Sequence, residues 1–178
     1  PQPAAGSEEP VVLLVPLIDS SGTDEAAAPL VNRKIEENLR LLGGFSLAGA
    51  EESEDALAEL SRVAHIGPET LLRATGRAGA DFAVVGQFLL DEDTLNLDLR
   101  LFSSAEDGQV SSFQKPAPAD GLFGVLAEAA QFVAEGVGAE VTSEERQRLA
   151  VSSPPSLEAY RTLLAALGEG NAADRLSL

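Results

Sequence analysis

The stretch that most constrains the fold is Gly79–Lys115, which predicts three consecutive strands joined by two short acidic turns. Phe82–Leu90 is a nearly unbroken apolar run, the pattern of a strand buried on both faces. Leu95–Leu101 alternates leucine with polar residues, which is the period of a strand with one buried and one solvated face. Gln109–Lys115 alternates with more polar residues and suits a sheet edge. The stretch therefore predicts an antiparallel meander.

The last of these strands is the part of the meander most open to a partner. Pro116 and Pro118 are expected to end it, because proline cannot donate to a strand ladder. A free edge can accept an extended segment of another protein by main-chain pairing, whereas the alternative is an edge already protected by Lys115 and the two prolines. The candidate partner-binding residues on this strand are Val110, Ser112 and Gln114.

Apolar spacing predicts further elements on both sides of the meander. Before it we expect a central strand at Val11–Ile18 disturbed by Pro16, a helix from Pro29 to Leu42, a brief strand at Phe45–Ala48, a helix at Ser53–His65 with Ser53 as N-cap, and a helix from Pro68 to Gly79. After it we expect a long helix from an N-cap at Asp120 to Val137, a short helix from Thr142–Glu145, a hinge at Ser152–Pro155 and a helix at Ser156–Leu167.

The first helix shows the amphipathic pattern most clearly. Val31, Ile35, Leu39 and Leu42 recur at helical spacing and are expected to face the core. The residues expected on its outer face are Arg33, Lys34, Glu36 and Glu37.

This order predicts an α/β fold with a mixed sheet of about five strands, arranged β-α-β-α-α-β-β-β-α, and a C-terminal helical segment. Residues 1–9 are expected to be a flexible tether and residues 10–142 the α/β domain. Residues 143–155 are expected to form the short helix and proline hinge, and residues 156–178 the beginning of a truncated helical hairpin.

Composition narrows the classes of partner. The chain has 178 residues and a net charge of −17, which disfavours nucleic acid and anionic membranes as partners. No apolar run approaches the roughly 18 residues of a membrane span. The absence of methionine and the opening PQPAAGSEEP lead us to expect an excised segment whose export signal or membrane anchor lay upstream.

Candidate chemical sites are few. The loop Asp19–Glu25 follows a strand and precedes a helix, so its oxygens could hold a hard cation, but its spacing matches no calcium loop and a solvated turn is the alternative. His65 is the only histidine and cannot build a metal site by itself. The acidic turns at 91–93 and 106–107 are typical of solvated hairpins. We expect no cofactor and no catalytic residue, and retain as candidate partner-binding residues Asp19, Ser20 and Ser21.

Three segments resemble the TolB N-terminal-like domain family, which is related to the CsgG, FlgO and LpoB envelope proteins. They are the opening VVLLVPLIDSSGTDE at 11–25, the segment Gly79–Gly86 (GADFAVVG), and Ser156–Leu167 behind its proline hinge. The chain departs from the family pattern at Leu17, where relatives have Phe, and at Asp19, where they have Asn.

The resemblance implies an extracytoplasmic binding or assembly module followed by tetratricopeptide repeats, and not an enzyme. We therefore expect a protein partner bound through a sheet edge or a helical groove. Assembly into a homo-oligomer is a further alternative. The alternative is a ligand-sensing regulatory domain attached to a membrane enzyme or kinase.

Overall fold

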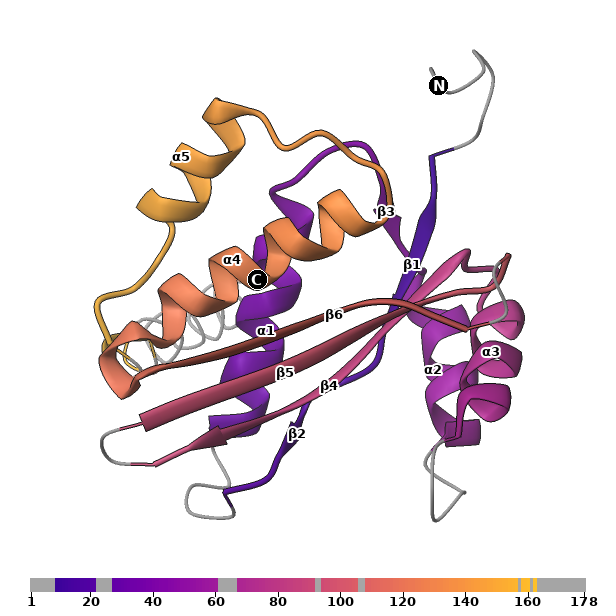
Figure 1. The fold of residues 1–178 in the computed structure, drawn as a ribbon, viewed down its shortest axis with the longest axis horizontal. Helices are drawn as coiled ribbons and strands as arrows, with labels where there is room; N and C mark the ends of the chain where they lie inside the picture. The colour runs from indigo at the N-terminus through magenta and orange to yellow at the C-terminus, as the bar shows by residue number, and fades with distance from the viewer. Residues whose placement is uncertain are drawn as a thin grey trace, which may run out of the picture.

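The computed structural model describes residues 9–21, 27–60, 67–91, 94–105, 108–156, 158–160 and 162 (Figure 1). Outside these residues lie most of the loop after Ser21, His65, the tips of both acidic hairpins and most of the C-terminal helical segment. The expectations for those positions therefore stay predictions.

The chain forms one mixed sheet, as predicted, although with six strands. The strands are β1 (Val11–Leu14), β2 (Ile18–Asp19), β3 (Ser46–Leu47), β4 (Phe82–Leu90), β5 (Thr94–Ser103) and β6 (Gly108–Pro118). Their order is β3-β1-β4-β5-β6, with β2 also paired to β4. The pairs among β1, β2, β3 and β4 are parallel, and β4, β5 and β6 form the predicted antiparallel meander. The extra strand arises because the chain is interrupted around Pro16, which separates β1 from β2.

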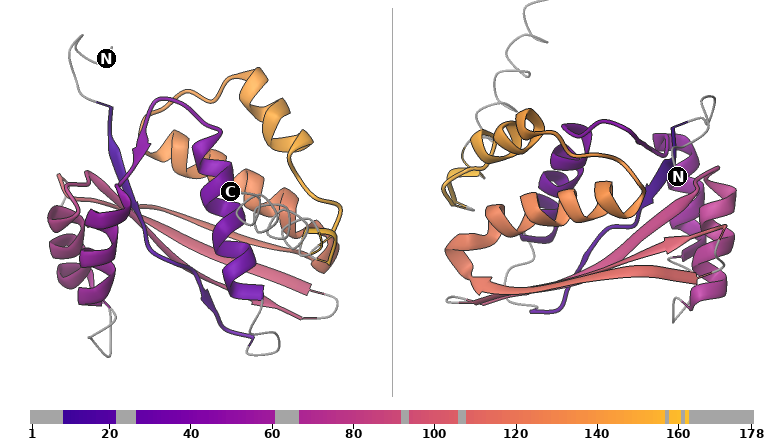
Figure 2. Two further views of the ribbon diagram at one scale, coloured as in Figure 1. Left: turned by 180° about the vertical axis from the view of Figure 1, so that it is seen from behind. Right: turned by 45° about the horizontal axis from the view of Figure 1, so that its top comes forward.

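Helices cover the two faces of the sheet unequally. They are α1 (Ala27–Arg40), α2 (Ala50–Leu60), α3 (Pro68–Arg77), the 3-10 turn η1 (Ala119–Gly121), α4 (Leu122–Gly136) and α5 (Ser143–Val151). α1 and α4 lie over one face, with α5 outside them, whereas α2 and α3 cover only one end of the opposite face (Figure 2). The rest of that second face is bare of described helices.

Two hydrophobic cores follow from this arrangement. The larger joins α1 and α4 to the sheet and includes Ile35, Phe88, Leu99 and Leu126, all fully buried. The smaller lies under α2 and α3, where buried side chains of Leu13 and Leu71 are among those that meet. The predicted core positions of the first helix and the helix after the meander are confirmed, since apolar residues three and four apart share one helix face.

Two predicted N-caps are wrong. α2 begins at Ala50, and the Ser53 hydroxyl lies inside the helix, 3.3 Å from the carbonyl oxygen of Ala48. Asp120 lies within η1, so the residue before α4 is Gly121 and no side chain caps that helix. In both cases the chain continues its turn further towards the N-terminus than the cap pattern indicates. By contrast, α5 begins as expected, with a reciprocal capping box between Thr142 and Glu145.

Lys34 does not lie on the outer face of α1 as predicted. It is 2% exposed, and its Nζ donates to the carbonyl oxygen of Ser152 at 2.9 Å. Beside it, the hydroxyl of Tyr160 donates to Glu37 at 2.9 Å. Burial lowers the pKa of Lys34 and raises that of Tyr160. The segment after α5 therefore covers a polar stripe that the sequence pattern assigns to solvent.

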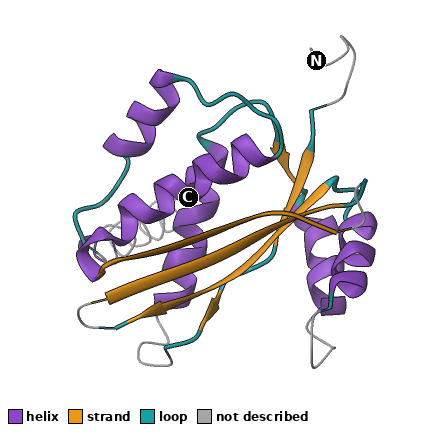
Figure 3. Cartoon of the chain, viewed as in Figure 1, coloured by secondary structure: helices purple, strands orange, loops and turns teal. Residues whose placement is uncertain are grey.

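The prolines do not end the last strand. β6 continues through Pro118 as the outermost strand of the sheet (Figure 3). Pro116 lies opposite Asn96 and Pro118 opposite Thr94 on β5. An edge strand tolerates proline wherever the missing N–H would point away from the neighbouring strand. Proline is excluded from a strand that is paired on both sides, but among the described strands β6 is paired on one side only, so the prediction that Pro116 and Pro118 end it is wrong.

Candidate functional site

The outer edge of β6 presents, at alternate residues, main-chain groups that no described strand pairs with. At the two ends of the β4–β5 pair, the N–H of Asp91 donates to the carbonyl oxygen of Thr94, and the N–H of Ser104 donates to that of Asp81, each at 2.9 Å. Even-numbered β5 residues therefore face β4. Odd-numbered β5 residues therefore face β6, and from Leu95 to Leu101 they pair with odd-numbered β6 residues, Ala117 to Ser111. It follows that the N–H and C=O groups of Ser112 and Gln114 point outward.

The side chains of these two residues lie on the bare face of the sheet. Their neighbours point the other way: Phe113 packs against Phe132 of α4 in a tilted arrangement with ring centroids 5.5 Å apart, and Lys115 binds Glu128 of the same helix. Ser112 and Gln114 alternate with these residues and are exposed. Val110 sits where the register shifts between Leu101 and Phe102 and has no partner residue on β5.

Asp19, Ser20 and Ser21 form a closed turn at the end of β2. The Asp19 carboxylate accepts the backbone N–H of Ser21 at 2.8 Å and the Ser21 hydroxyl at 2.5 Å. The Ser20 N–H bonds the carbonyl oxygen of Phe88 at 2.8 Å, and its hydroxyl lies 3.2 Å from the amide oxygen of Gln87. The Asp19 side chain is therefore engaged locally, as in an Asx turn.

The structure brings the two predicted segments onto one surface. Ile18 pairs with Gln87, Gln87 with Asp98, and Asp98 with Gln114, which makes one row across four strands. Ile18 is 61% exposed at one end of this row. We call this surface the open face, defined by Ile18, Gln87, Asp98, Arg100, Ser112 and Gln114.

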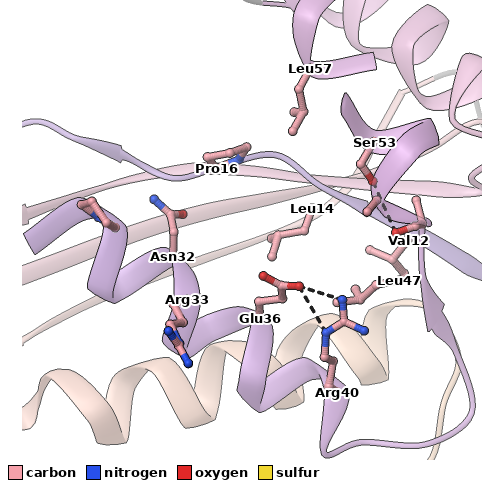
Figure 4. Close-up of a pocket in the computed structure, with 13 residues that line it drawn as sticks. Val12, Leu14, Pro16, Asn32, Arg33, Glu36, Arg40, Leu47, Ser53 and Leu57 are labelled. Atoms are coloured by element: carbon pink, nitrogen blue, oxygen red, sulfur yellow. Dashed lines mark hydrogen bonds and ion pairs between the residues drawn. The ribbon is translucent and has the colours of Figure 1, made fainter. Parts of the chain in front are cut away.

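A second open edge lies in a cleft of about 380 Å³ at β1 (Figure 4). Leu57 and Ser53 of α2 approach from one side, Glu36 and Arg40 of α1 lie on the other, and Leu14 lies between them. We call this the β1 cleft, and its other lining residues include Val12, Pro16, Asn32, Arg33, Leu47 and Ala50.

Polar side chains on α1 are already engaged within the β1 cleft. The Arg40 guanidinium lies 2.7 Å from Glu36, and Arg33 lies 3.1 Å from Glu37. The Asn32 amide accepts the Leu17 N–H at 2.6 Å and donates to the Leu17 carbonyl oxygen at 3.1 Å. The cleft is thus equipped to hold a chain by shape and main-chain bonds.

The acidic side chains near the two edges assemble no metal site in the described part of the chain. Among the described residues, no group of three or more His, Cys, Asp or Glu side chains is placed to hold a metal ion. Among the described carboxylates, Glu145 has the most strongly perturbed pKa, which is lowered to about 2 by the backbone N–H and hydroxyl of Thr142 and by the Gly43 N–H. These bonds, at 2.7–2.8 Å, join the start of α5 to the loop between α1 and β3, so Glu145 has a structural role.

Sequence reasoning missed the β1 cleft and its residues Asn32, Glu36 and Arg40. The position of Asn32 could have indicated a hydrogen-bonding role, because this polar amide follows Val31 and lies near the buried side of a predicted helix. The cleft itself depends on β3 being short, and no local pattern encodes how far two distant strands overlap.

No protein-family model matches this chain, and no curated protein matches it. Similar solved structures exist. Lipoprotein GNA1162 from Neisseria meningitidis has a TM-score of 0.50 and 16% identity, over 71% of this chain and 96% of that one. The LpoB C-terminal domain from Salmonella enterica has a TM-score of 0.48 and 13% identity, over 65% and 87% of the two chains. TolB from Acinetobacter baumannii has a TM-score of 0.45 and 18% identity, over 74% and 28%.

At these identities the likeness concerns the fold alone. The fold expected from the family resemblance is thus supported by GNA1162, whereas nothing in the comparisons supports a tetratricopeptide repeat beginning at Ser156. None of the described helices has the length and apolarity that crossing a bilayer requires.

Proposed function

We propose that this chain is a non-enzymatic interaction module that binds a partner protein through an open sheet edge. The observation that carries the proposal is the outer edge of β6, where Ser112 and Gln114 offer main-chain donors and acceptors that no described strand uses. A partner strand added there would satisfy these groups and place its own side chains beside the open face. Ser20 at the far side of that face extends the same surface.

We further propose that the module belongs to a bacterial envelope-associated protein and works outside the cytoplasm. The support is its fold, which it shares with a lipoprotein of Neisseria meningitidis. A charge of −17 agrees with a protein partner, since it would repel nucleic acid and anionic lipid.

A pair of serine-to-proline variants tests the β6 edge. Ser112→Pro removes one outward N–H and leaves the ladder to β5 in place, because the N–H it deletes does not face β5. Ser143→Pro is the matched control, since Ser143 is the exposed first residue of α5, where proline is well tolerated.

The immobilised proteins are incubated with bacterial envelope extract, and the retained proteins are quantified by mass spectrometry. We expect at least one protein to be retained by the wild type and by Ser143→Pro, and lost with Ser112→Pro. Equal retention of every captured protein by all three would contradict binding at this edge.

A further inference from the structure

The main chain of β1 alternates between its two neighbours. The Val11 carbonyl oxygen accepts the Asp81 N–H at 2.8 Å, and the Val15 N–H donates to Val84 at 2.9 Å, so odd-numbered residues face β4. The Val12 carbonyl oxygen instead accepts the Ala48 N–H at 2.9 Å, next to β3. Even-numbered residues of β1 therefore face the side on which β3 lies.

Leu14 is the next residue on that side, and β3 does not reach it. β3 pairs only with Val11 and Val12, because the chain turns away after Leu47 and enters α2. Within the described part of the chain, no main-chain group across from Leu14 bonds to its N–H or C=O. These two groups border the β1 cleft, in the row that β3 leaves vacant.

The next outward-facing residue, Leu17, shows which kind of group can bond the main chain at this edge. After the interruption at Pro16, the outward N–H and C=O of Leu17 are both bonded by the side-chain amide of Asn32, at 2.6 and 3.1 Å. An amide thus already occupies the place of a neighbouring strand at Leu17, while no described group fills the place beside Leu14. The vacancy fits another peptide group.

The walls of the cleft indicate the side chains that a bound segment would carry. Leu14, Leu47 and Leu57 line it with apolar surface. On α1 the charges are paired within the helix, Arg40 with Glu36 and Arg33 with Glu37. On α2 they are not balanced, because Ala50–Leu60 contains acids and no basic residue. Glu54 is exposed, and it shares a helix face with two lining residues, four positions after Ala50 and three before Leu57.

We propose that the β1 cleft binds an extended segment of a partner polypeptide in which apolar and basic side chains alternate. Its main chain pairs with Leu14 in the row beyond β3, one apolar side chain packs against Leu14 and Leu47 on the α1 side, and the basic side chains meet the acidic lip of α2. This site is separate from the β6 edge, so the two proposals succeed or fail independently.

The probe is an acetylated, fluorescein-labelled hexapeptide of sequence Lys-Val-Lys-Val-Lys-Val, titrated against the whole chain by fluorescence anisotropy. The peptide N–H that bonds Leu14 belongs to the central valine in one register and to the adjacent lysine in the other. We expect N-methylation of one of these two residues to weaken binding by about fivefold, the effect of losing one main-chain hydrogen bond. Glu54→Lys should weaken it by about threefold, while Glu158→Lys, an equal charge change at an exposed residue of another segment, should leave it unchanged.

Nuclear magnetic resonance of the 15N-labelled chain locates the probe and reports whether the variants remain folded. We expect the largest amide shift at Leu14, with Ser112 and Gln114 unaffected. Shifts confined to Ser112 and Gln114 would overturn the β1 site and leave the β6 proposal standing. Absence of any shift at millimolar peptide, or binding that is insensitive to N-methylation at both positions, would also overturn it.

Discussion

The two candidate binding edges, β6 and the stretch of β1 that β3 leaves uncovered, are built in opposite ways. β6 is long and lies at the outside of the sheet, with Ser112 and Gln114 directed to solvent. The β1 edge is open at one residue, Leu14, and is recessed between α1 and α2. Two prolines within β6 limit pairing at its outer edge, because Pro116 and Pro118 have no N–H to donate outward.

The difference shows two ways in which a sheet edge is kept from unwanted pairing. Along β6, proline limits the number of donors that any incoming strand can use. At β1, the walls of the cleft limit which strand can enter at all. We therefore expect the β6 edge to be permissive and the β1 cleft to be selective for side-chain chemistry.

The largest effect that tests this comparison comes from proline on the two sides of β6. Ser111→Pro removes a donor that faces β5 and should lower the free energy of unfolding by about 3 kcal/mol, whereas Ser112→Pro should lower it by less than about 1 kcal/mol. Urea denaturation of both variants measures the difference. Equal losses would mean that Ser112 is not an outward residue.

The next effect concerns the amide that closes the β1 edge. Asn32→Ala leaves the N–H and C=O of Leu17 without their partner and should lower the free energy of unfolding by about 2 kcal/mol. Asn96→Ala, on the exposed face of β5, is the matched control and should change it by less than about 0.5 kcal/mol. If the two variants melt alike, Asn32 does not act as the neighbour of this edge.

Glu145 is expected to determine how firmly β3 is held beside β1. Its pKa is lowered from 4.5 to about 2, so its stabilising contribution is present above pH 4.5 and is lost as the pH falls towards 2. At neutral pH, Glu145→Gln should weaken the bond to Gly43, and the Ser46 amide, which pairs with Pro10, should exchange its hydrogen several-fold faster.

Hydrogen exchange of Phe113 in β6 serves as the internal reference for that experiment. Its exchange rate should not change, because β6 lies at the other edge of the sheet. Faster exchange at both amides would point to global destabilisation and contradict a local role in holding β3.

The smallest effect is expected at Lys115, whose side chain turns to Glu128 on α4 and away from the edge. Lys115→Ala should change the free energy of unfolding by less than about 1 kcal/mol, because the pair is exposed to solvent. It should also leave partner binding at β6 unchanged in the envelope-extract assay. Stronger retention by the variant would show that Lys115 shields the edge after all.

Much of the fold could be predicted because its signals are local. The alternating leucines of Leu95–Leu101, the apolar run of Phe82–Leu90 and the helical spacing from Val31 to Leu39 each identify an element and its buried face. The N-caps at Ser53 and Asp120 were wrong, because a single polar residue before an apolar run also fits the interior of a first turn.

The candidate site was only partly predictable. Ser112 and Gln114 followed from strand polarity, but their placement in one row with Ile18 and Gln87 depends on the register of four strands. The β1 cleft could not be anticipated, because it exists where β3 stops.

The sequence by itself determined the type and order of the elements, the acidic character and the interruption at Pro16, because side-chain periodicity and proline chemistry act over a few residues. Only the tertiary structure decided that Lys34 is buried, that β6 continues through its prolines, and that no described group bonds the outward main chain of Leu14. Those outcomes depend on whether a segment distant in the sequence covers a residue or pairs with it. Local sequence patterns do not encode such long-range contacts.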